Sequence, residues 1–149
     1  MKRRHALSAL KKSFFLGRKI FRVRIVRRRR RNSTAASKKK FVEHKESARA
    51  LVHRKLEEFN RHYGFVYHRV TIRDQRSRWG SASKKGNLNF NYRIVHLPEQ
   101  LADAIIVHEL CHLKEFNHSK KFWSLVGETI PDHKARKQAL GRMSATLLQ

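Results

Sequence analysis

Residues 101–118 read LADAIIVHELCHLKEFNH, an apolar run that closes on three histidines and a glutamate. Residues four apart lie one above the other on the same face of a helix, so His108 and His112 can both direct a ring nitrogen at one metal ion. His118 follows six residues later, which requires the chain to leave the helix and turn back. Asn117 suits that turn because Asn tolerates the left-handed conformation. We therefore expect a site of three neutral imidazoles on a central HExxH helix.

Three protein ligands leave one tetrahedral position open for water, which distinguishes a catalytic zinc from a structural one. Zinc lowers the pKa of such a water to roughly 7, and Glu109, on the adjacent helix face, can accept the proton and pass it to a leaving amine. An HExxH motif followed by a suitably placed His arises by chance in roughly a few per thousand sequences of this kind, so the signal is specific. The motif predicts a hydrolase with one zinc ion per chain and Glu109 as its catalytic base.

Cys111 and Glu115 bear on the kind of site that the motif forms. Cys111, inside the motif, is expected to pack in the core rather than to bind the metal. The histidine spacing equals that of the metzincins, but Glu115 stands where they have a turn glycine, and no Met-turn follows. The sequence does not indicate that clan.

Charge is distributed unevenly along the chain. The 149 residues hold 36 Lys and Arg against 11 Asp and Glu, a net charge of +25, and residues 1–40 contain 17 of the basic residues and no acid. We expect 1–40 to be a basic tail, disordered or extended, that binds a polyanion such as nucleic acid without sequence preference, and 41–149 to be the single domain. A short strand at residues 21–25 and an organellar transit segment are the alternatives for this tail.

The single cysteine fits a reducing cytosol, and no apolar run has the length of a membrane span, so we expect a cytoplasmic protein without membrane contact. Around the motif, apolar periodicity predicts an α+β fold in which a small antiparallel sheet packs on helices. The expected elements are a helix from Ser47 to Gly64, a strand at 66–73, a hairpin of 76–81 with 88–93, a helix from Pro98 to about Glu115, and two helices capped by Ser119 and Asp132.

Several motifs together resemble those of the YgjP-like metallopeptidase family, related to SprT-like proteins, over about residues 46–135. These are 71–73 (TIR), 78–81 (RWGS), 86–91 (GNLNFN) and 108–123, from HELCH to FW. The resemblance implies a zincin-like α+β domain with His108, His112 and His118 as metal ligands and Glu109 as catalytic acid and base. Ala82 replaces a cysteine that is frequent in the family, and residues 1–40 are shorter and more basic than the family's usual N-terminal region.

The resemblance leaves the substrate open between a peptide and a nucleotide such as UTP, because a hydrated metal can attack a carbonyl or a phosphoryl centre. For a peptide, an edge strand near the metal would pair with the extended substrate. The residues expected to contact it are Arg78, Trp79, Gly80, Ser81, Asn89 and Asn91. Equally, Trp79 can belong to the core and the Asn row to a solvated or internally bonded face. For a nucleotide, Arg73, Arg76, Arg78 and Arg93 would supply phosphate contacts. A nucleic-acid-binding protein with a vestigial metal site is the third hypothesis.

Overall fold

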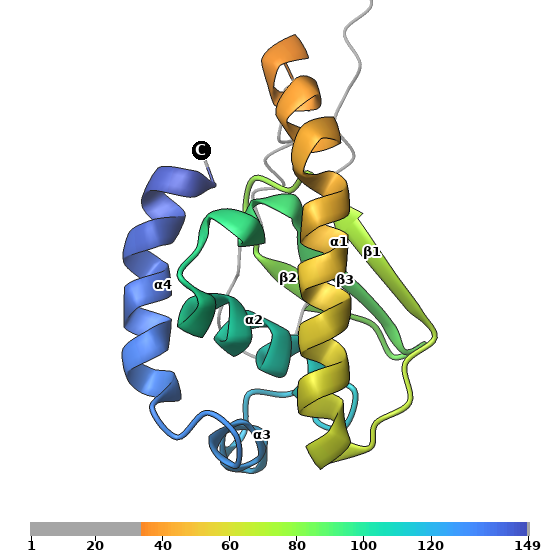
Figure 1. Ribbon diagram of the computed structural model, residues 1–149. Helices are drawn as coiled ribbons and strands as arrows, with labels where there is room; N and C mark the ends of the chain where they lie inside the picture. The colour runs from red at the N-terminus through yellow and green to blue at the C-terminus, as the bar shows by residue number, and fades with distance from the viewer. Residues whose placement is uncertain (1–33, 149) are drawn as a thin grey trace, which may run out of the picture. The chain divides into compact units, whose positions relative to one another are not determined.

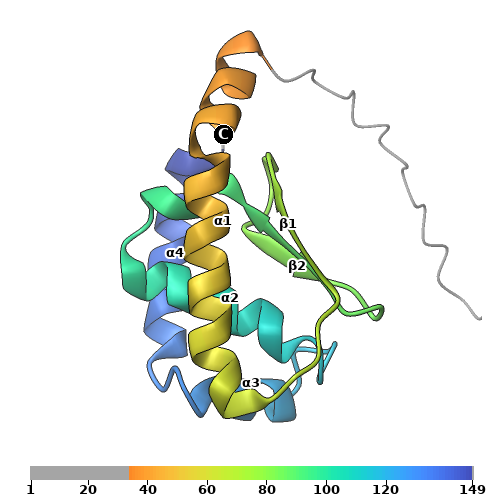
Figure 2. The same ribbon diagram turned by 45° about the vertical axis from the view of Figure 1, so that its right-hand side comes forward.

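The computed structural model describes residues 34–148, which form an α+β fold (Figure 1). In chain order its elements are α1 (Ala35–Tyr63), β1 (Arg69–Arg73), β2 (Gly80–Ala82), β3 (Asn87–Asn91), the 3-10 helix η1 (Tyr92–His96), α2 (Glu99–Cys111), α3 (Lys120–Gly127) and α4 (His133–Leu147). In Figure 2 the sheet lies to one side of α1 and α4 to the other, with α2 crossing behind α1. The α+β class predicted from the sequence is confirmed.

The sheet is mixed, with strand order β1-β3-β2. β2 and β3 form the expected antiparallel hairpin, but β1 pairs in parallel with β3, so the prediction of an antiparallel sheet was wrong. The loop after β1 and the hairpin turn each reverse the chain, which leaves β1 and β3 running in the same direction. Their register places Ile72 opposite Phe90, and both side chains are buried. By pairing with the edge of β3 that β2 leaves free, β1 turns its apolar face into the core.

Helix α1 begins twelve residues earlier than the predicted start at Ser47. Its N-cap is Thr34, whose side chain accepts a hydrogen bond from the N–H of Ser37, and the Ser37 hydroxyl donates to Asp74 at 2.7 Å. Residues 35–40, predicted as tail, are therefore helical, as the strong helix propensity of Ala and Lys permits. The C-terminal cap is the expected one, with Gly64 in the left-handed conformation.

The rest of the predicted tail, including the strand suggested at 21–25, lies outside the described residues. No helix within residues 34–148 combines the length and apolarity needed to cross a membrane.

Helix α2 is the centre of the domain. Ile106 and Leu110 belong to a cluster with the sheet and α1, whereas Val107 and Cys111 belong to a second cluster with α3. Because core residues surround α2, the histidine side chains that it carries have a fixed base. The helix ends at Cys111, earlier than the predicted Glu115, and the following turn is closed by a hydrogen bond from the N–H of Glu115 to the carbonyl of Cys111.

Candidate metal centre

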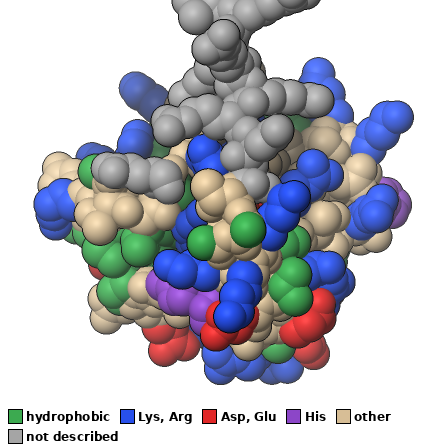
Figure 3. All heavy atoms as spheres, turned by 90° about the horizontal axis from the view of Figure 1, so that it is seen from above, with side chains coloured by type: hydrophobic (Ala, Val, Ile, Leu, Met, Phe, Trp, Pro, Cys, Tyr) green, Lys and Arg blue, Asp and Glu red, His purple; other side chains and the backbone are tan. Residues whose placement is uncertain are grey.

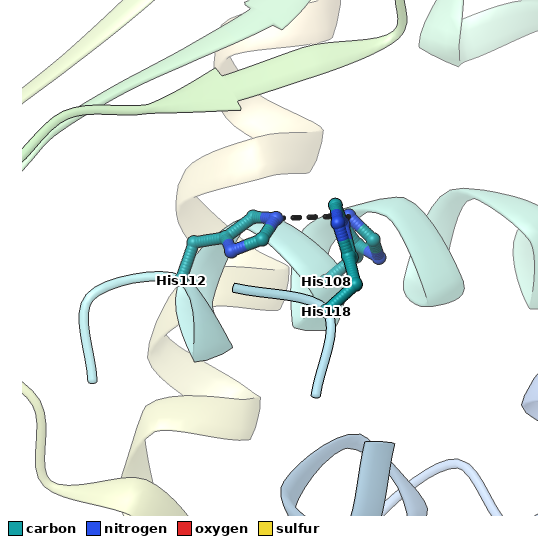
Figure 4. Close-up of side chains that lie close together, drawn as sticks. All are labelled: His108, His112 and His118. Atoms are coloured by element: carbon teal, nitrogen blue, oxygen red, sulfur yellow. Dashed lines mark hydrogen bonds between the residues drawn. The ribbon is translucent and has the colours of Figure 1, made fainter. Parts of the chain in front are cut away.

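The structure brings the three histidines of the motif together. His108 lies in the last turn of α2, His112 caps that helix, and His118 lies on the segment that leads to α3 (Figure 4). The Nε2 atom of His108 is 3.1 Å from Nε2 of His112 and 3.0 Å from Nε2 of His118. Ligands on a tetrahedral zinc at 2.0 to 2.1 Å are separated by about 3.3 Å, so this spacing is close to that of three ligands on one ion.

The ring of His112 is held in the form that a metal needs. Its Nδ1–H donates a hydrogen bond to the carbonyl oxygen of Glu115 at 3.0 Å. A carbonyl only accepts, so the proton of the neutral ring is on Nδ1 and the lone pair is on Nε2, which faces the other two imidazoles. Such a partner on the outer nitrogen orients the ring and raises its basicity as a ligand.

The electrostatics of the three rings also fit a cation. Burial, followed by the charges of His112, His118 and Lys137, lowers the pKa of His108 to about 3, and burial lowers that of His112 as well. A single proton on Nε2 of His108 can satisfy only one of its two close contacts, whereas a cation accepts all three lone pairs. The residues present therefore fit a divalent metal that prefers imidazole ligands, zinc among them.

His118 is the most exposed of the three, and an aromatic stack supports its ring. Trp123 of α3 stacks on it with ring centroids 5.8 Å apart, and His133 also stacks on Trp123, at 5.2 Å. Ser119 caps α3 through a hydrogen bond from the N–H of Phe122, which fixes where that helix begins, as predicted. The third imidazole is thus positioned by the start of α3.

Glu109, next to His108 in the sequence, is buried, with 7% of its surface exposed. Burial raises the pKa of its carboxyl group to about 8, against the opposing effect of the Arg78 charge. Gly80 at the start of β2 packs directly on it: a Cβ atom at this glycine would lie 2.6 Å from Cγ and 2.8 Å from Oε1 of Glu109. The carboxylate occupies space that only a glycine at position 80 leaves free.

A cavity of about 630 Å³ opens beside this centre. It is bounded by the start of β2, by α2 and α3, and by one face of α4. Its lining residues are Arg78, Trp79, Gly80, Ala104, Ile105, His108, Glu109, His118, Trp123, Val126, His133, Lys137 and Leu140. His108, His118 and the buried Glu109 therefore share one opening with a largely apolar space, which is the usual form of a substrate site.

The residues predicted to contact substrate are divided between several environments. Arg78, Trp79 and Gly80 line the cavity, although the Trp79 indole N–H is already donated to the Ser144 hydroxyl at 2.7 Å. Ser81 lies on β2, which has β3 on one side only.

The two asparagines lie on the central strand β3. The Asn89 amide donates to Ser81 across the hairpin at 3.3 Å. Asn91 is 0% exposed, and its side-chain amide donates to the carbonyls of Gln75 and Arg78. Asn91 therefore has no surface to offer a substrate, and it shapes the β1–β2 loop from beneath.

The part of the cavity lining that α4 contributes was not predicted from the sequence. His133, Lys137 and Leu140 are spaced four and three residues apart, so they share one helix face, and that face lines the cavity. This spacing was visible in the sequence, but its mixture of a histidine, a lysine and a leucine does not indicate what the face would pack against.

Comparison with known proteins agrees with this arrangement of fold and site. The chain matches the YgjP-like metallopeptidase domain over residues 3–143, and it belongs to that family. The match begins well before the predicted residue 46 and includes most of the basic N-terminal segment. Family and fold together identify a metal-dependent peptidase.

Among solved structures, the chain is similar to the metallopeptidase zymogen abylysin of Pyrococcus abyssi. The TM-score is 0.55 at 27% sequence identity, covering 60% of this chain and 90% of that one. This likeness supports the zincin-like fold expected from the sequence. No curated protein matches the chain.

Proposed function

We propose that this protein is a zinc-dependent peptidase in which His108, His112 and His118 hold the metal and Glu109 is the general base. The observation that carries this proposal is the convergence of three Nε2 atoms beside a buried carboxyl group. A bound zinc ion would supply an activated water and would polarise the carbonyl of the scissile bond.

Glu109 would move the proton in this reaction. Its carboxylate would accept the proton of the attacking water and pass it to the nitrogen of the scissile bond, which then leaves as a neutral amine. Burial raises the pKa of Glu109, which makes its carboxylate a stronger base, and Gly80 packs directly against this group. The chain needs no covalent intermediate for this chemistry.

β2 is the element best placed to bind an extended peptide. It lies at the edge of the sheet, whereas β3 is central and has both edges paired. Ser81 and Gly80 therefore belong to a strand that can accept another strand, and Gly80 lies against Glu109. A peptide paired with β2 would run past the metal-binding side chains.

The proposal is tested on the purified full-length protein, loaded with zinc and offered an unfolded protein and, separately, UTP. We expect cleavage of the protein substrate, loss of at least about 100-fold activity in Glu109→Gln, and one zinc ion retained by that variant. His112→Ala should lose the zinc, whereas His53→Ala, an exposed histidine of α1, should keep it.

Hydrolysis of UTP alone, abolished by the same Glu109 substitution, would replace the peptidase proposal with a nucleotide pyrophosphatase. Retention of one equivalent of zinc by His112→Ala would contradict the ligand assignment.

We propose, in addition, that the basic N-terminal segment brings the enzyme to nucleic acid. The support is compositional, because residues 27–31 are five consecutive arginines in a stretch without acids.

A further inference from the structure

The cavity beside the metal centre carries more positive charge than its own residues neutralise. Arg78, before β2, and Lys137, on α4, both line it and both are exposed. Neither forms an ion pair with any residue in 34–148, and Lys137 instead lies over the Trp123 ring, with its Nζ 5.0 Å from the centroid. The one acid in the lining is Glu109, so the cavity has two cationic side chains against a single carboxyl group.

The deeper walls of the same cavity are apolar. Ala104 and Ile105 of α2 and Val126 of α3 are buried, and Leu140 of α4 is half-buried. Trp79 is held in place by its bond to Ser144 and presents its ring to this space. The volume of about 630 Å³ exceeds that of any single side chain, so the cavity holds a large apolar group and still leaves room for a polar one.

We propose that this cavity is the specificity pocket of the peptidase, and that it takes a large apolar substrate side chain together with a carboxylate held by Lys137 and Arg78. The proposal rests on the proposed function, because it makes the cavity a substrate pocket. The carboxylate has two sources in a peptide: the C-terminus of the apolar residue itself, or an adjacent Asp or Glu side chain.

The lining favours a carboxylate over a polyphosphate. Two exposed cations, one before β2 and one on α4, suit one single charge, and a triphosphate beside Glu109 would meet a carboxyl group instead of a third cation. A base could stack on Trp123, but that ring already contacts His118, His133 and the Lys137 ammonium group. A peptide side chain can enter the apolar space without stacking on the Trp123 ring.

Ligand binding in the cavity can be followed by tryptophan fluorescence, because Trp79 and Trp123 are the only two tryptophans of the sequence and both line the cavity. Tryptophan fluorescence of the zinc-loaded, full-length protein is titrated with N-acetylphenylalanine, its neutral amide, N-acetylalanine and the amide of acetyl-Phe-Asp. We expect N-acetylphenylalanine to bind about tenfold more tightly than its amide and than the alanine compound. Comparable affinity of the acetyl-Phe-Asp amide would identify a side-chain carboxylate as an equal source, and weak binding would restrict the pocket to C-termini.

Lys137→Met keeps the apolar stem and removes the charge, so it should abolish the preference for carboxylate over amide and leave the preference for Phe over Ala. Lys134→Met, a matched substitution at an exposed position of α4 that does not line the cavity, should change neither. If the carboxylate preference survives in Lys137→Met combined with Arg78→Gln, a bound metal holds the carboxylate and the proposal is overturned.

UTP that quenches more strongly than N-acetylphenylalanine and displaces it would also overturn the proposal. The binding titration needs no turnover, so it tests the pocket even if no peptide is cleaved. Cleavage of unfolded protein without any preference for these residues would leave the proposed function standing and refute the pocket.

Discussion

Gly80 and Glu109 show how the absence of a side chain at one position leaves room for a buried carboxyl group at another. The sequence analysis placed Gly80 among the substrate contacts, yet its closest contact in the structure is the side chain of Glu109. A Cβ atom at position 80 would come within 3 Å of Cγ, Cδ and Oε1 of that glutamate. Because the Glu109 side chain can rotate away, we expect an added Cβ at position 80 to displace this side chain and to leave the fold intact.

Gly80→Ala should therefore displace the carboxylate and lower kcat/KM by about 100-fold, the effect of a misplacement near 1 Å. Zinc content should stay at one equivalent, because the three atoms nearest to the added Cβ all belong to Glu109 and none to a histidine. Gly141→Ala is the matched control: a Cβ there meets nothing within 4 Å, and the helix should gain up to about 1 kcal/mol. Full activity in Gly80→Ala would show that Glu109 does not need this space.

The residues with a defined chemical pattern were the easiest to predict. The spacing of His108, His112 and His118 was sufficient to expect that their rings meet, and the structure brings them together. The contact between Gly80 and Glu109 was not predictable, because it joins a strand and a helix whose packing has no local signature. The same reason hid Lys137, which is near the centre only because α4 packs beside α2.

At the scale of elements, Lys55 links α1 to α2. Its side chain is 6% exposed, and its Nζ lies 2.7 Å from Glu99, 3.2 Å from Asp103 and 3.3 Å from Glu58. Burial alone would lower the pKa of this lysine, but hydrogen bonds to Glu99 and Asp103 outweigh it and raise the pKa above the ordinary 10.5. The lysine is thus charged and paired between the two helices that form the core.

Lys55→Met should destabilise the protein by about 2 kcal/mol. This is less than the 3 to 5 kcal/mol for breaking a fully buried pair, because Glu58 and Glu99 are more than half exposed. Since the folded pKa of Lys55 is raised, its charge is fully present below pH 10.5, and its contribution is lost as the pH rises through the folded value. From neutral pH upward, where the partner carboxylates are ionised, the difference in urea unfolding free energy between wild type and variant should be constant to pH 10.5 and shrink above it. A difference that grows with pH would refute this assignment.

The elements were predictable where the local sequence determines the structure, and not where contacts with distant segments determine it. Gly64, Ser119 and the β2–β3 hairpin follow from capping and turn chemistry within a few residues. The first turns of α1 were missed because residues 35–40 have no apolar periodicity, although Ala and Lys favour a helix. The parallel β1–β3 pair was not predicted because its paired residues, such as Arg69 and Asn87, are 18 residues apart in the sequence. Such a pairing depends on how the side chains pack in the core and not on a local pattern.

For the whole molecule, charge is the dominant property. All 11 acidic residues fall after residue 40, together with 19 of the basic ones, so even the folded part is positive. Lysine and arginine side chains are spread over most of the face seen in Figure 3, and the acidic ones lie mostly near its lower edge. A protein of this kind is attracted to any polyanion, and residues 27–31 add the densest cluster of charge.

Replacing residues 27–31 by five glutamines tests whether that cluster supplies the contact with nucleic acid. Each phosphate neutralised on duplex DNA contributes about 0.9 to the slope of log affinity against log salt, so the slope should become shallower by up to about 4 if these arginines bind phosphates. The loss should be the same for unrelated sequences, since phosphate contacts carry no base information. Zinc content and peptide cleavage should not change, because these arginines are not among the residues that form the metal centre. Unaltered affinity and slope would assign the attraction to the folded residues after 33, and a loss of zinc would show that the arginines serve the domain that the family match extends over.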